Sequence, residues 1–192
     1  RFDERALFVA ATATAAEQTA RVDGTVRLDT DAPYLDLRVR AERFAPAAVY
    51  AESPYTGTVS ADVRVTGTMD APTVDGHVSA EGGTVSDIDV TRADADVAYA
   101  DGILSFQNLA AEAFGGNIAG EGTLSAADLS YAAHLKIEGL PLDPLRTDAQ
   151  LPLPVDLSGI LSADLGIEGQ GTERTGLAVY GSAEVLNGMY RA

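Results

Sequence analysis

The sequence predicts an all-β fold, and three observations lead to that prediction. Apolar and polar residues alternate with a period of two in many short stretches, which is typical of strands with one dry and one wet face. Asp-Gly and Asn-Gly pairs punctuate these stretches, as they do at hairpin turns and bulges. The chain also repeats itself at an interval of about 100 residues, which is typical of a stacked array of similar units.

The clearest alternation runs through residues 58–66, where Val59, Ala61, Val63 and Val65 take the odd positions and polar residues take the even ones. Counting all such stretches predicts roughly a dozen strands with short connections. The other stretches are Tyr34–Ala41, Val74–Ala80, Ala93–Tyr99, Leu104–Phe106, Tyr131–Glu138 and Leu157–Glu168.

Four dipeptides are hairpin or bulge signals: Asp23-Gly24, Asp75-Gly76, Asp101-Gly102 and Asn187-Gly188. Residues 4–21 are rich in alanine and could form a helix on propensity alone, but their alternation favours a strand. Short helical turns are expected at residues 45–51 and 144–149, where proline can open a turn.

Composition limits the possible functions. Apolar residues make up 46% of the chain and charged residues 22%, which is typical of a folded domain. No apolar run reaches the ~18 residues of a membrane-spanning helix. The absence of cysteine excludes disulfides and thiolate metal sites. A net charge of −16 argues against nucleic acid as a partner, and predicts a soluble chain that is monomeric near neutral pH.

The internal repeat divides the chain into units. Gly24-Thr25-Val26 recurs as Gly122-Thr123-Leu124, and Leu37 and Val39 recur as Leu135 and Ile137. We therefore expect the end of one unit at 1–23, a full unit at 24–121 and a truncated unit at 122–192. Since the last residues read as part of a strand, the chain is expected to be a fragment of a longer protein.

No catalytic or metal-binding constellation can be assembled, so neither enzymatic activity nor a cofactor is expected. His77 and His134 fall on the polar side of alternating strands. The acidic residues between Asp87 and Asp101 lack the spacing of a calcium loop, and a solvated face explains them better. The glycines at 115–122 resemble a phosphate loop but lack its lysine and its helix.

The sequence resembles the repeated C-terminal region of the TamB and AsmA-like family. The resemblance rests on the phrase 57–68 (GTVSADVRVTGT), followed by Asp70-Ala71-Pro72 and Val74-Asp75-Gly76. It continues through residues 82–85, 99–104, 114–118 and 120–124. The second copy departs from the pattern, because residues 169–174 lack the expected proline.

The resemblance implies a curled, elongated sheet, the β-taco, with a hydrophobic concave interior that holds phospholipid acyl chains. The implied role is inner-to-outer membrane lipid transport and outer-membrane biogenesis in the Gram-negative periplasm, with an inner-membrane anchor outside this chain. The expected lining residues are Leu35, Leu37, Val39, Val59, Val63, Val65, Leu135, Ile137, Leu161, Leu165 and Ile167.

Three alternatives stay open. The apolar faces of two sheets could close on each other as a sandwich, in which case the same residues are plain core. The chain could assist the assembly of outer-membrane β-barrel proteins, with a TamA-type insertase as partner through strand addition. A passenger-like β-helix is the third, although its coils of about 20 residues do not suit a unit of about 100.

Overall fold

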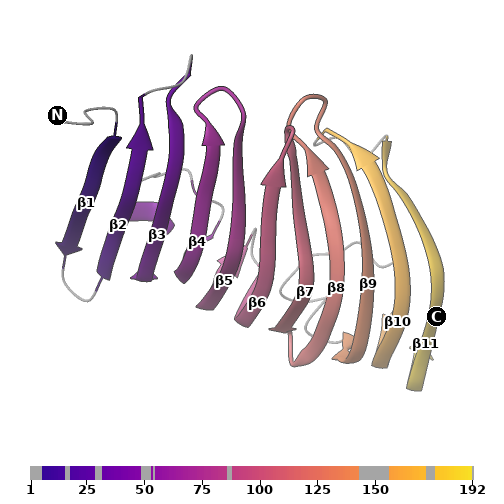
Figure 1. Cartoon of the computed structure of the whole chain (residues 1–192). Coiled ribbons are helices and arrows are strands. Elements are labelled where there is room, and N and C mark those ends of the chain that lie inside the picture. The colour runs from indigo at the N-terminus through magenta and orange to yellow at the C-terminus, as the bar shows by residue number, and fades with distance from the viewer. Residues whose placement is uncertain are drawn as a thin grey trace, which may run out of the picture.

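The described residues of the chain form one antiparallel sheet of eleven strands, in which every strand lies beside its neighbours in sequence, from β1 at one edge to β11 at the other. In the computed structural model the sheet is open and curved (Figure 1). The strands are β1 (Ala6–Ala15), β2 (Gln18–Arg27), β3 (Tyr34–Phe44), β4 (Thr58–Thr68), β5 (Pro72–Val85), β6 (Ile88–Ala100), β7 (Ile103–Ala113), β8 (Gly116–Ser125), β9 (Ser130–Pro141), β10 (Asp156–Gln170) and β11 (Ala178–Arg191).

The structure describes residues 6–15, 18–28, 32–48, 53, 55–85, 88–142, 156–171 and 176–191. Within these residues there is one sheet and no second layer of strands, so the all-β prediction is confirmed and the sandwich alternative is wrong. Each predicted alternating stretch falls inside a strand. The predicted units meet within β8, where the sheet is continuous, so the division at residue 122 stays a prediction.

Two tight turns join the central strands. Asp101 and Gly102 both have positive φ angles, of 51° and 78°, between β6 and β7. Phe114 and Gly115 repeat this geometry between β7 and β8, with φ angles of 52° and 80°. Such turns match the right-handed twist of the flanking strands, which explains the glycine at the second position of each. The turn predicted at Asp101-Gly102 is confirmed.

The other Asp-Gly signals were misread. Asp23-Gly24 lies inside β2 and Asp75-Gly76 inside β5, and neither makes a turn or a bulge. At both sites the glycine allows neighbouring backbones to come close, because a Cβ on Gly24 or Gly76 would lie 2.8 Å or 2.6 Å from the Cα of Leu37 or Val63. Asn187-Gly188 is a bulge in β11, where the register with β10 shifts.

The described residues of the alanine-rich N-terminal stretch, 6–15 and 18–21, are extended, as predicted, although they belong to two strands, β1 and β2. A short 3-10 helix, η1 (Pro46–Ala48), confirms the first predicted helical turn. The second, at 144–149, lies outside the described residues.

Replacing Gly76 with alanine should weaken the contact between β4 and β5. The added methyl would lie 2.6 Å from the Cα of Val63, so the backbone must shift, at a cost of roughly 1–3 kcal/mol in the free energy of unfolding. Gly176 is the matched control, because an added Cβ there would meet nothing closer than 3.7 Å. Chemical denaturation measures both variants, and equal stability of the two would contradict this account.

Candidate functional site: an apolar sheet face

The apolar residues of successive strands meet on one face of the sheet. Residues that pair directly across antiparallel strands point to the same side. One row of direct partners crosses from β3 to β9 and contains only apolar or aromatic side chains. This row is Leu37, Val65, Val74, Tyr99, Leu104, Leu124 and Tyr131.

The register places the eleven sequence-predicted lining residues on this apolar face. Val39 lies opposite Val63, Leu135 lies opposite Leu165, and Leu161 lies opposite Leu140. All eleven are half-buried. The structure thus brings them together on a single surface, while their role toward lipid stays a prediction.

Bulges keep the face continuous where a strand departs from strict alternation. In β7 the apolar positions change from Leu104 and Phe106 to Leu109 and Ala111, because Asn108 adopts a φ angle of 51° and the register shifts there. Without this extra residue, one half of β7 would direct its apolar side chains to the opposite face.

The lining residues predicted from the sequence did not include the larger, aromatic side chains of the apolar face. Phe44, Tyr99, Phe106 and Tyr131 all occupy it by register. Phe44 reaches it because a bulge with Arg43 at a φ angle of 49° precedes it. The signal for Tyr99 and Phe106 was already in the alternation, whereas the bulge at Arg43 was invisible to a period-two pattern.

No second layer of strands covers the apolar face within the described part of the chain. The most buried side chains, Ala95, Ala113, Leu140, Leu142 and Ala163, include no aromatic group and are 4–8% exposed. At the edges the side chains of this face are far more open: Leu7 of β1 is 57% exposed and Val179 of β11 is 55% exposed. The most buried part of the surface therefore lies between β6 and β10, and the strands at both edges are more open.

The opposite, polar face carries a network of charged side chains. Arg38 Nε donates to Asp62 Oδ1 over 2.7 Å, and Arg64 Nε donates to Asp36 Oδ1 over 3.0 Å. The bond from Arg38 is the main cause that lowers the pKa of Asp62. Since these side chains are about half exposed, each pair contributes little to stability.

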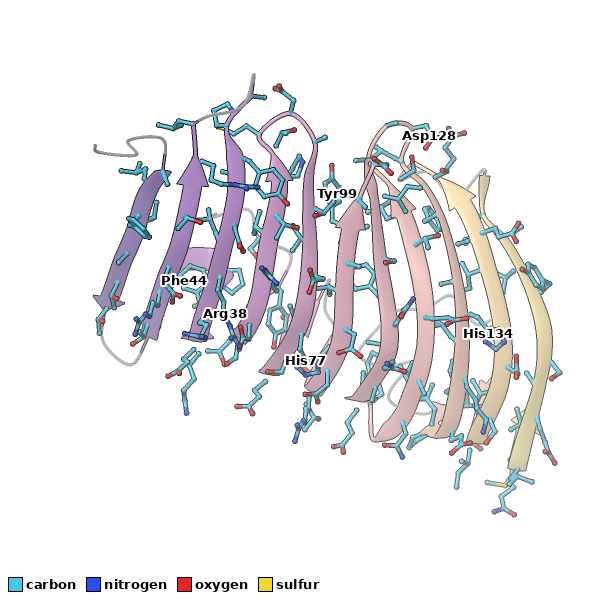
Figure 2. All side chains as sticks on the ribbon, viewed as in Figure 1. Arg38, Phe44, His77, Tyr99, Asp128 and His134 are labelled. Atoms are coloured by element: carbon cyan, nitrogen blue, oxygen red, sulfur yellow. The ribbon has the colours of Figure 1, made fainter. Side chains whose placement is uncertain are left out.

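Both histidines stand on the polar face beside an aspartate, on separate strands, β5 and β9 (Figure 2). His77 Nδ1 lies 3.0 Å from Asp96 Oδ1, and His134 Nε2 lies 2.7 Å from Asp164 Oδ1. The hydrogen bond with Asp96 is the main cause that raises the pKa of His77, and Asp94 adds to it. On the other neighbouring strand, β4, Asp62 lies directly opposite His77.

Asp128 secures the turn between β8 and β9. Its carboxylate accepts hydrogen bonds from the backbone nitrogen and the hydroxyl of Ser130, over 3.1 Å and 2.8 Å. Hydrogen bonds from Ser125 and Ser130 lower the pKa of Asp128 to about 2. The ionised carboxylate of Asp128 therefore stabilises this turn by accepting hydrogen bonds.

The motifs weighed for chemistry have structural places in the sheet. Gly115 belongs to a tight turn, and Gly120 lies on the apolar face opposite Leu135. Asp94 and Asp96 share one strand face, where Arg92 binds Asp94 and His77 binds Asp96. No group of three or more potential metal-ligating side chains occurs among the described residues. No helix in the described part of the chain is long and apolar enough to cross a membrane.

Shallow hollows open on the polar face of the later strands. One of about 480 Å³ lies over β6–β9 and contains Arg92, Asp94, Lys136 and Glu138. Its two cations already bind neighbouring carboxylates, over 2.7 Å for Arg92 and 2.6 Å for Lys136. Three carboxylates in this hollow outnumber its two cations, so it does not attract an anion, and the apolar face is the stronger candidate site.

The sequence matches the family model described as the TamB C-terminal domain over residues 10–192. The chain belongs to this family. Neither a curated protein nor a solved structure matches it. The TamB family is associated with transport and assembly in the Gram-negative envelope, and its members are scaffold and transport proteins. The open β-sheet with one apolar face agrees with the fold that the resemblance implied.

The contact of His77 with Asp96 predicts a stability that depends on pH. Because folding raises the pKa of His77, the added stability is complete below its unfolded value, near 6.5, and is lost as pH rises through the folded value. His77→Gln should therefore destabilise the protein more at acidic than at alkaline pH. Thermal unfolding of both proteins at several pH values measures this difference, and Asp96→Asn in both backgrounds should reduce it.

Proposed function

We propose that this chain is a non-enzymatic scaffold that holds the acyl chains of phospholipids along its apolar face. The observation that supports this is the unbroken apolar row from Leu37 on β3 to Tyr131 on β9, on a sheet without a second strand layer among the described residues. A contiguous apolar surface that no other part of a protein covers usually binds a partner.

The physical chemistry of the face suits an acyl chain. Each CH₂ group that leaves water contributes roughly 0.8 kcal/mol. Because apolar side chains follow one another without a charged residue in the row, a chain could slide along it with little change in free energy. Eleven strands spaced about 4.8 Å apart form a surface on the order of 50 Å long.

The proposed setting is the periplasm, where the chain would contribute to lipid transport between the inner and outer membranes and to outer-membrane biogenesis. Family membership supports the envelope location. The anchor to the inner membrane would lie in a segment outside these residues. Lipid head groups would stay at the hydrated rim, since the sheet buries no polar or charged side chain among its described residues.

Val63→Asp tests the proposal, because Val63 lies half-buried in the middle of the apolar face, between Val39 and Gly76. On an open face the new carboxylate can hydrate, so the melting temperature should fall only modestly while the amount of bound lipid drops several-fold. Differential scanning calorimetry and extraction of co-purified lipid measure the two effects, and a fluorescent fatty acid gives the affinity.

Ser60→Asp is the matched control, since it places the same charge on the same strand but on the polar face. It should leave lipid binding unchanged. Full lipid occupancy in a folded Val63→Asp protein would contradict the proposal at this position. Unfolding of that variant, with Ser60→Asp stable, would show that the apolar face is a closed core.

A second candidate function is the assembly of outer-membrane β-barrel proteins, through strand addition with a TamA-type insertase. The observation in its favour is β1, whose ten residues carry no charge and which pairs only with β2 among the described residues. Edge strands that stay single are usually protected by charged residues, proline or bulges.

A charge on that edge distinguishes this second function. Ala10→Lys puts a cation on exposed β1, while Ala119→Lys puts the same cation on the exposed polar face of interior strand β8. We expect Ala10→Lys to weaken co-purification with the insertase several-fold and Ala119→Lys to leave it unchanged. If both variants weakened co-purification equally, β1 would not be the binding site of the insertase.

A further inference from the structure

The charge of the polar face is distributed unevenly along the sheet. Strands β2–β4 carry six arginines against four acidic residues, a net charge of +2. Strands β5–β11 carry twelve acidic residues against three basic ones, a net charge of −9. The overall charge of −16 therefore conceals one region of the sheet in which cations prevail.

Within that region the register places like charges directly opposite each other. Arg21 on β2 lies opposite Arg40 on β3, and Arg38 on β3 lies opposite Arg64 on β4. Direct opposition of like charges costs stability in a sheet. We name the polar-face surface of Arg21, Arg38, Arg40 and Arg64 the arginine patch.

Each of these arginines also has an aspartate within ion-pair distance, including Asp36 at 3.0 Å from Arg64, and these aspartates offset the repulsion. Asp23 lies 3.2 Å from Arg21 and 3.4 Å from Arg40, and Asp62 binds both Arg38 and Arg40. The four arginine side chains remain 39–59% exposed. Each guanidinium has five N–H donors, so donors remain for a further anion after these ion pairs form.

We propose that the arginine patch is a docking surface for a membrane that carries anionic head groups. Charge complementarity selects an anionic partner, and arginine binds phosphate groups through paired hydrogen bonds. The shape of the patch favours a membrane over a protein: the patch spreads over three adjacent strands, and the hollows described above lie over β6–β11. Protein docking sites usually add aromatic anchors in pockets.

The acidic strands do not cancel this attraction. Asp75 of β5 lies directly opposite Arg64, but neighbouring strands lie about 4.8 Å apart, so β6 and the strands beyond it lie roughly 10 Å or more from β4. Their charges are therefore farther from Arg64 than the screening length of about 8 Å at physiological ionic strength.

Vesicle binding tests the proposal on the whole chain. The protein should float with vesicles of phosphatidylcholine that contain phosphatidylglycerol, and stay unbound with phosphatidylcholine alone. A basic residue near an anionic membrane strengthens binding about fivefold. The Arg38→Gln/Arg64→Gln variant should therefore bind at least fivefold more weakly, and binding of the parent should weaken as salt is added.

The matched control is Arg92→Gln/Lys136→Gln, which makes the same change in net charge and also breaks two local ion pairs, but in the acidic strands. It should bind vesicles like the parent. Circular dichroism checks that both variants keep the sheet. Equal loss of binding in both variants, or equal binding of the parent to neutral vesicles, would overturn the proposal. Salt-sensitive self-association without vesicle binding would instead assign the patch to the acidic strands of a second copy.

Membrane docking at the arginine patch is independent of the proposed lipid binding to the apolar face, because the two surfaces lie on opposite faces of the sheet. Arg38→Gln/Arg64→Gln should retain the affinity for a fluorescent fatty acid, and Val63→Asp should retain vesicle binding. Loss of vesicle binding in Val63→Asp would show that the apolar face holds the membrane, and would overturn the proposal for the arginine patch alone.

Discussion

The register between neighbouring strands is the constraint on which the rest of this structure depends. A slip of one residue between two strands would turn all apolar side chains of the slipped strand to the other face. Across the sheet the partners remain apolar, from Leu37 opposite Val65 to Leu135 opposite Leu165. One continuous dry surface results, and the charged residues are left for the opposite face.

Irregular residues maintain that register. The bulges beside Arg43 and Asn108 return Phe44 and Leu109 to the apolar face after the alternation would have lost them. Mid-strand glycines such as Gly76 remove a side chain where the adjacent backbone comes close. Bulges and glycines also bend and twist strands, so the features that keep the face continuous fit a curved sheet.

The two faces follow different physical rules. Burial gives the apolar face its contribution to stability, while the exposed ion pairs of the polar face contribute little. The arrangement of charge on the polar face is therefore open to other uses. It separates arginine-rich strands β2–β4 from acidic strands β5–β11, a division that a single value of net charge cannot express.

The sequence by itself determined the all-β class, the apolar positions of strands such as Thr58–Thr68, and the family, because alternation and repeated phrases are local patterns. It could not separate Asp101-Gly102, which turns, from Asp75-Gly76, which lies inside β5, because both dipeptides allow the same backbone angles. Only the tertiary structure decided between an open sheet and a sandwich, since period-two alternation describes either. It also decided that Phe44 joins the apolar face and that Arg38 lies opposite Arg64, because pairing across strands depends on bulges and register and not on the order of residues along one strand.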